Sequence, residues 1–292
     1  MPIATLRPGE EVADVFACTR KDRLVARSGT PYLALELRDQ TGSIQARAFR
    51  DADLLAGRFE RGDLVKVAGR VERFRDELQL DVRAIAKAAP GEADPATFLP
   101  KAYRDLDELD GFLEHLAGEV RDPGFGALLA NLLGDEKLRA AWRRAPCTRG
   151  GHHAYLGGLL EHTVAVATLA QEAWTLHQRL DHALLVTAAI VHDLGKTREF
   201  TYGAEIGLTD EGRLLGHVEL GLRLLEVRGD AVGLDAAHRL ALAHCVLCHH
   251  GPEAAPNRRF GSPEALALYR LNALDATVKG ALEHGLYPQD HR

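Results

Sequence analysis

The sequence predicts a small β-barrel followed by an all-helical domain, because the spacing of apolar residues changes once along the chain. Between residues 10 and 88, apolar and polar residues alternate, as they do in strands that bury one face. After residue 100, apolar residues recur every three or four positions, which is the helical period. A stretch rich in Ala, Pro and Gly separates the two patterns. We therefore expect a barrel domain over residues 1–88, a linker over 89–100 and a helical domain over 101–292.

Five strands are predicted in the first domain. Leu33, Leu35 and Leu37 alternate with other residues, and the turn residues Asp39–Gly42 follow them. The same alternation marks four further segments: residues 12–19, 44–48, 65–71 and 78–84. Residues 51–58 are suited to a short helix between the third and fourth strands. Five short strands with one helical interruption fit an oligonucleotide/oligosaccharide-binding (OB) barrel.

Helical spacing predicts seven helices in the second domain: 106–116, 128–133, 159–176, 183–193, 211–228, 234–249 and 263–286. The longest apolar run, Ala183–Val191, is far shorter than the roughly 20 residues that cross a bilayer, so no membrane partner is expected. No charged segment followed by an apolar one opens the chain, as it would in a secretory signal. The four cysteines are too few for a disulfide framework. These features predict a cytoplasmic protein.

Composition and charge narrow the class of protein. A hydrophobic content of 46% with 6% aromatic residues is that of a globular chain. The first 88 residues carry 16 Lys and Arg against 14 Asp and Glu, whereas the remainder carries 20 against 28. A mildly basic module joined to an acidic one is compatible with nucleic-acid binding by the first, although this small excess does not establish it.

The helical domain contains a set of histidines with one carboxylate at its centre. His192 and Asp193 close an apolar helical run and are followed by Gly195, which we interpret as a helix stop, and by Lys196. The other members stand on separate predicted helices: His162, His217, His249 and His250. Imidazole nitrogens bind Mn, Fe, Co, Ni and Zn, and a carboxylate that bridges two ions favours harder ones such as Mn²⁺. Two ions about 4 Å apart can activate water for attack on a phosphodiester.

Each of these residues also has a purely structural interpretation. His192 alone could be a hydrogen-bonded core histidine, His217 an exposed capping residue, and the pair before Gly251 a helix end. Cys245-Val246-Leu247-Cys248-His249 matches the haem-attachment string C-x-x-C-H, but buried thiols on a helix are the simpler interpretation. Lys196 could be solvated or could contact a phosphate. The metal interpretation rests on the set as a whole.

Several segments carry a resemblance to a known family: RGGHHAYLGGLLEHT, AAIVHDLGK, LTDEGRLLGHVELG, VLCHHG and LYRLNALDA, spanning most of residues 146–277. They resemble the YhaM-type 3′-5′ exoribonucleases, in which an OB module precedes an HD domain. The resemblance implies that His162, His192 and Asp193 hold a first metal ion. A second ion is implied on Asp193, His217, His249 and His250. The resemblance further implies that Lys196 approaches the scissile phosphate and that His152, His153 and Tyr155 line the substrate entrance.

The chain departs from this family at one ligand position. The family's last metal ligand is an Asp in a stretch similar to YADNLDA, and Asn272 stands at that position here. A neutral amide oxygen binds a divalent ion more weakly than a carboxylate does. Asp275 lies one helical turn further on and is the candidate to replace it or to hold a bound water. Two expectations follow: either the first metal is bound weakly, or catalysis depends mainly on the second.

The polar faces of the second and third strands suggest how the barrel would bind RNA. Tyr32, Arg38, Gln45, Arg47 and Phe49 lie there, and stacked bases with backbone contacts to cations are typical of OB domains. Arg47 and Phe49 are the strongest candidates for substrate contact. An inward-facing Phe49 would remove this interpretation.

These patterns together predict a metal-dependent 3′-5′ exoribonuclease that hydrolyses single-stranded RNA to 5′-mononucleotides. Single-stranded DNA is an alternative substrate. The predicted catalytic residues are Asp193 and Lys196, and the predicted cofactors are two divalent ions, Mn²⁺ first, with Co, Fe, Ni or Zn as alternatives. Two other functions stay open. One is an HD phosphohydrolase or phosphodiesterase for small nucleotides, and the other is a nucleic-acid-binding protein whose catalytic site is weakened at Asn272. Assembly into a homo-oligomer is also left open.

Overall fold

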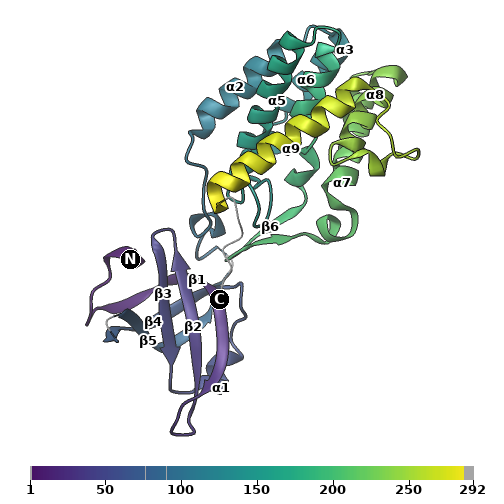
Figure 1. The fold of residues 1–292 in the computed structure, drawn as a ribbon. Coiled ribbons are helices and arrows are strands. Elements are labelled where there is room, and N and C mark those ends of the chain that lie inside the picture. The colour runs from purple at the N-terminus through teal and green to yellow at the C-terminus, as the bar shows by residue number, and fades with distance from the viewer. Residues whose placement is uncertain (1, 76, 90, 286–292) are drawn as a thin grey trace. The chain divides into compact units, whose positions relative to one another are not determined.

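Five strands close into a barrel in the N-terminal part of the chain (Figure 1). The computed structural model describes residues 2–75, 77–89 and 91–285. The strands pair in the closed order β1-β2-β3-β5-β4, with β3 and β5 parallel and the other pairs antiparallel. Their bounds are β1 Glu11–Val25, β2 Pro31–Asp39, β3 Gly42–Ala48, β4 Leu64–Phe74 and β5 Glu77–Lys87, and a helix α1 Ala52–Ala56 lies between β3 and β4. The predicted five-stranded OB barrel with one helical interruption is confirmed.

The alternation of residues explains why these strands close on a core. Leu33, Leu35 and Leu37 are almost completely buried, whereas their neighbours in β2 are half-buried. β4 shows the same pattern with Val65 and Val67. Since side chains on a strand alternate between its two faces, one apolar face per strand is enough to fill a small barrel.

A short hairpin interrupts the second half of the chain. Its strands are β6 Phe200–Tyr202 and β7 Ile206–Leu208. The chain divides into two units, and the hairpin residues Thr201–Gly207 group with the first unit, up to Pro100, while the second comprises Lys101–Phe200 and the residues from Leu208 onward. The expectation that the chain is helical almost to its end is therefore wrong at this hairpin. Each strand has only 3 residues, which is too short for a period-2 pattern to be recognised in the sequence.

The hairpin uses one residue that the sequence analysis placed on the RNA-binding face. Arg38 donates a hydrogen bond from Nη2 to the carbonyl oxygen of Ala204 at 2.6 Å. Ala204 is fully buried and packs with Ala17 and Phe98. Arg38 thus has a structural partner within the first unit, in contrast to the expected contact with nucleic acid.

The second unit is built from helices around a central apolar one. The helices are α2 Leu106–Gly118, α3 Pro123–Leu133, α4 Glu136–Arg144, α5 Gly158–Leu176, α6 His182–Val191, α7 Asp210–Ala231, α8 Ala236–Cys248 and α9 Pro263–His284. Every residue from Leu184 to Val191 is buried, and α6 contacts α5, α8 and α9 (Figure 1). A helix that is apolar on all sides must lie inside a protein. The C-terminal end of α6 therefore opens into the interior of this unit.

Seven of these helices coincide with predicted ones, and α4 was not predicted. Its sequence EKLRAAWRR is largely polar, and Trp142 is its one buried residue. The Trp142 indole N–H donates to Oγ1 of Thr163 on α5 at 3.2 Å. The predicted continuation of the last helix to Leu286 lies outside the described residues. Within the part of the chain that the structure describes, no helix combines the length and apolar character needed to cross a membrane.

Candidate metal centre

The end of α6 places Asp193 at the centre of the histidines. Val191 ends the helix, His192 follows in helical conformation, and Asp193 has φ −106° and ψ 10°, outside the helical region. This break turns two neighbouring side chains, which would diverge by about 100° on a helix, toward one cavity. Both residues are buried, at 0% and 2% exposure. The change of conformation at Asp193 is therefore what allows the pair to serve one site.

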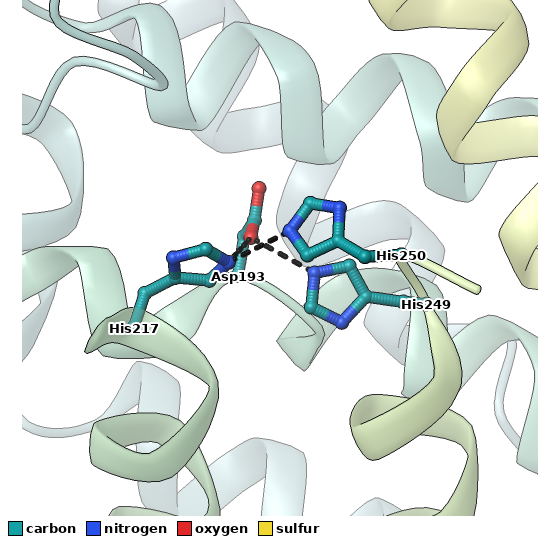
Figure 2. Close-up of side chains that lie close together, drawn as sticks. All are labelled: Asp193, His217, His249 and His250. Carbon is teal, nitrogen blue, oxygen red and sulfur yellow. Dashed lines mark hydrogen bonds and ion pairs between the residues drawn. The ribbon is translucent and has the colours of Figure 1, made fainter. Parts of the chain in front are cut away.

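Two histidines lie beside one oxygen of the Asp193 carboxylate, and a third lies beside one of those two. Figure 2 shows His217 on α7 facing His249 and His250 at the end of α8, with Asp193 between them. Oδ1 of Asp193 lies 3.4 Å from Nε2 of His217 and 3.4 Å from Nε2 of His249. Nε2 of His217 lies 2.9 Å from Nε2 of His250. One ligand atom from each of the four lies within 4.8 Å of the others. We name these four residues the second cluster, because they are the residues that the resemblance assigned to the second ion.

Two further histidines lie beside the other carboxylate oxygen. Nε2 of His162, on α5, is 3.6 Å from Oδ2 of Asp193, and Nε2 of His192 is 3.4 Å from it. The two imidazole nitrogens are 3.2 Å apart. We name His162, His192 and Asp193 the first cluster. The structure thus brings together all six residues that the resemblance assigned to two ions, with Asp193 in both clusters.

The hydrogen bonds of the imidazole rings show which nitrogens are free to bind a cation. Nδ1 of His192 donates to the carbonyl oxygen of Ala189 at 2.9 Å, and Nδ1 of His249 donates to that of Val246 at 2.6 Å. A carbonyl can only accept, so in the neutral rings each Nε2 carries a lone pair. Nδ1 of His162 lies 2.6 Å from a carboxylate oxygen, which has the same consequence.

Burial favours the neutral form of three of the clustered histidine rings. It lowers the pKa of His162 and His249, and it lowers the pKa of His250 to about 3, with the neighbouring His249 adding to the effect. Oδ1 of Asp193 and Nε2 of His249 are buried and have no hydrogen-bond partner among the described residues. An unpaired buried acceptor costs about 1–3 kcal/mol, and a divalent cation would satisfy all of these atoms together. The residues therefore fit a metal centre.

Lys196 contacts Oδ2 of Asp193, which is the carboxylate oxygen beside the first cluster. Its ammonium lies 2.6 Å from Oδ2 of Asp193, and the side chain is buried. Burial alone would lower the pKa of Lys196, but the attraction of Asp193 outweighs it and the pKa is raised. In the same way burial would raise the pKa of Asp193, yet Lys196 and His192 hold that pKa well below its ordinary value. The pair is charged, and Lys196 fixes the orientation of the carboxylate.

Asp275 lies on the far side of the His162 ring from the other ligands. Its Oδ2 accepts from Nδ1 of His162 at 2.6 Å and from Nε2 of His153 at 3.0 Å. Carboxylates that bind the second nitrogen of a metal-ligating histidine fix its tautomer and orientation. Asp275 is thus placed to hold His162. Its replacement of the ligand at Asn272, or its support of a bound water, stays a prediction. Asn272 is buried and donates from Nδ2 to the backbone carbonyl of His249 at 3.2 Å.

The residues expected at a substrate entrance are largely buried. His153 and Tyr155 are 1% and 8% exposed, so neither lines an opening. The Tyr155 hydroxyl donates to Oε2 of Glu161 at 2.8 Å and lies 3.0 Å from Nδ1 of His153. These side chains extend the support of His162 through Asp275, which is a different role from the expected one. His152 is partly exposed, and burial together with His162 lowers its pKa to about 4.

Two glycines that position His217 were not recognised as such from the sequence. A Cβ on Gly195 would lie 1.9 Å from the carbonyl oxygen of His217 and 2.5 Å from the amide nitrogen of Gly221. Gly195 therefore allows close packing on α7, and the interpretation as a helix stop is wrong. Gly216 has φ 72° and ψ 165° inside α7, a region open essentially to glycine alone. This kink directly precedes His217.

On the barrel, aromatic and cationic side chains form a surface group. The Phe49 ring is 46% exposed and stacks on Tyr32 with centroids 5.2 Å apart, so it does not turn inward. The Arg47 guanidinium lies 5.7 Å from the Tyr32 centroid and 5.2 Å from that of Phe74. Phe74, at the end of β4, is 47% exposed and was missed because it lies outside the predicted strand. We name Tyr32, Arg47, Phe49 and Phe74 the aromatic platform.

Comparisons with known proteins agree with both parts of this description. A family model described as an HD domain matches residues 159–277, and one described as an OB-fold nucleic acid binding domain matches residues 15–88. The chain therefore combines an OB-fold module with an HD domain. It is 30% identical over 277 residues to the 3′-5′ exoribonuclease YhaM of Bacillus velezensis, an alignment that covers 92% of this chain and 86% of that protein. The chain belongs to the YhaM 3′-5′ exoribonuclease family, as its sequence motifs predicted.

Solved structures that match part of this chain include a domain of replication protein A from Methanococcus maripaludis and a small single-stranded DNA-binding protein from Streptomyces coelicolor. The first is 22% identical with a TM-score of 0.26, and covers 30% of this chain and 92% of its own. The second is 20% identical with a TM-score of 0.26, and covers 30% of this chain and 100% of its own.

We predict that Gly195→Ala lowers the metal content of the protein. The added methyl group cannot be accommodated without moving the α7 backbone at His217, which removes one ligand from the second cluster. Bound manganese per chain, measured by elemental analysis after desalting, should fall by at least one ion. Gly111→Ala is the matched control, because a Cβ there meets nothing within 4 Å. An unchanged metal content in Gly195→Ala would contradict the assignment.

Proposed function

We propose that this protein is a metal-dependent 3′-5′ exoribonuclease that hydrolyses single-stranded RNA to 5′-mononucleotides. The observation that carries the proposal is the position of Asp193, whose two oxygens face two separate groups of histidine nitrogens. Such a shared carboxylate is suited to two ions that act on one phosphodiester. Membership of the YhaM family supports the same activity, and the OB module supports a nucleic-acid substrate.

The residues of the chain have distinct parts in this mechanism. His162, His192 and Asp193 would hold one ion, and Asp193, His217, His249 and His250 the other. Bound ions of this kind lower the pKa of water and offset charge on the phosphodiester. Asp193 would contribute to both sites, and Lys196 keeps its carboxylate in place through the 2.6 Å contact. Contact between Lys196 and the scissile phosphate stays a prediction. Mn²⁺ is the ion we expect at the second cluster.

The aromatic platform gives the barrel a means of binding RNA without regard to sequence. Exposed rings at Phe49 and Phe74 offer faces on which bases stack, and Arg47 supplies a charge for the backbone. Every base has a flat face, so stacking tolerates all four, and single-stranded DNA is expected to bind as well. We also propose that the protein acts in the cytoplasm and that several copies assemble. The proposed domain limits are 1–88 for the barrel, 89–100 for the linker and 101–292 for the helical domain.

The activity is tested with a 5′-labelled single-stranded RNA and Mn²⁺. We expect a ladder of products that shorten from the 3′ end, and we expect Asp193→Ala to produce none. Mononucleotide and cyclic substrates should be hydrolysed far more slowly. Hydrolysis of those small substrates with the RNA left intact would contradict the proposal in favour of a small-nucleotide phosphodiesterase. RNA that is bound and never cleaved would instead point to a binding protein with a weakened site.

A second prediction concerns the aromatic platform. Phe49→Ala and Arg47→Glu should weaken the binding of single-stranded RNA, since each stacked base contributes roughly 1–3 kcal/mol, or about 5- to 150-fold in Kd. Fluorescence anisotropy with a labelled oligoribonucleotide measures this. Leu54→Ala is the control, because Leu54 is 60% exposed on the barrel and lies outside the platform. Equal affinities in all the variants would show that the aromatic platform does not bind RNA.

A further inference from the structure

A thiol lies directly beside the first cluster. Cys147 stands in the segment between α4 and α5 and is 1% exposed. Its backbone is fixed by a hydrogen bond from its amide to the carbonyl oxygen of His153 at 3.0 Å. Its Sγ is 3.7 Å from Oδ2 of Asp193 and 3.4 Å from Nζ of Lys196. No role was predicted for Cys147 from the sequence.

A partly exposed histidine completes a group of potential ligands around this thiol. Nε2 of His152 lies 3.4 Å from Sγ of Cys147, and the His152 ring is 5.3 Å from that of His162, centroid to centroid. Ligand atoms of Cys147, His152 and His162 lie within 4.8 Å of one another. His162 also belongs to the first cluster, so the thiol and the additional imidazole are continuous with that site.

These separations can be compared with those around a tetrahedral zinc ion. Zn–S and Zn–N bonds of about 2.3 and 2.0–2.1 Å separate two ligand atoms by roughly 3.3–3.6 Å. The observed distances are 3.4 Å between Cys147 and His152 and 3.2 Å between the Nε2 atoms of His162 and His192. Within each pair the two atoms are therefore spaced as ligands of one ion, and His162, which is common to the two groups of ligand atoms, connects them.

We propose that Cys147 and His152 join His162, His192 and Asp193 in binding the first metal, which makes this site selective for Zn²⁺ over Mn²⁺. Thiolate and imidazole are the ligands that zinc prefers, whereas manganese prefers oxygen. The thiol releases its proton to solvent as the metal–sulfur bond forms, and the Lys196 ammonium lies close enough to favour the negative sulfur. A sulfur ligand also accounts for a first site that functions with Asn272 where its relatives have a carboxylate. The inference deepens the proposed function, because it assigns the first cluster to a metal.

The test uses cobalt as a spectroscopic substitute for zinc. Titration of the metal-free full-length protein with Co²⁺ should produce a near-ultraviolet thiolate-to-cobalt charge-transfer band that saturates with one equivalent. Cys147→Ser should lack this band while still binding cobalt at the second cluster. Cys18→Ser is the matched control, because Cys18 is a fully buried thiol in the barrel, and it should keep the band.

A second measurement starts from the unmodified protein. Zinc X-ray absorption of the unmodified protein loaded with one equivalent should show one sulfur neighbour, and zinc should displace manganese from the first site. In Cys147→Ser the preference for zinc should fall by about tenfold or more. Absence of sulfur around zinc, or a charge-transfer band that persists in Cys147→Ser, would overturn the inference. RNA hydrolysis decides the proposed function separately: an active enzyme without a sulfur ligand refutes only the role of Cys147, and a sulfur ligand in a protein that never cleaves RNA refutes only the nuclease.

Discussion

The buried carboxylate of Asp193 is the constraint on which the helical unit depends. A negative charge with 2% exposure is very unfavourable unless it is paired. Lys196 pairs with one oxygen at 2.6 Å, but the other oxygen has no hydrogen-bond partner among the described residues. Burial lowers the pKa of His162, His249 and His250, so these three rings do not supply positive charge. A cation between the carboxylate and the imidazole nitrogens resolves this imbalance, which links the stability of the site to the chemistry that it performs.

The surrounding elements serve to bring ligands to this carboxylate. α6 is buried on all sides, so that its end delivers His192 and Asp193 to the interior. Asp275 on α9 fixes the ring of His162 on α5, and the break at Gly216 sets the direction of α7 at His217. The barrel contributes no ligand to either cluster. Its platform instead presents rings and a guanidinium for RNA, so the proposed functions of the two modules are separate.

Much of the fold and of the metal centre could be predicted from the sequence. Alternation at Leu33, Leu35 and Leu37 reports a strand because side-chain direction has a period of two, and α6 reports a buried helix by its unbroken apolar run. Histidine and aspartate are rare enough inside apolar helices that His192 and Asp193 stand out in the sequence. Patterns of this kind lie within short continuous segments, so they can be recognised without knowing which distant segments come into contact.

The features that escaped prediction depend on contacts between distant segments. Gly195 matters because the backbone of His217 passes next to it, and Cys147 matters because of its distance from Asp193. No spacing in the sequence carries either fact. α4 escaped because a polar helix with one buried tryptophan has no apolar periodicity, and His153 was misplaced because motif position does not show burial.

The most direct test of the central claim is electron paramagnetic resonance of the manganese-loaded protein. Two ions that share the Asp193 carboxylate are magnetically coupled, so the account predicts two Mn²⁺ per chain at saturation and a spectrum of a coupled pair. Asp193→Asn should abolish the coupling. A spectrum of isolated Mn²⁺ in the saturated unmodified protein would contradict the claim that one carboxylate joins the two clusters.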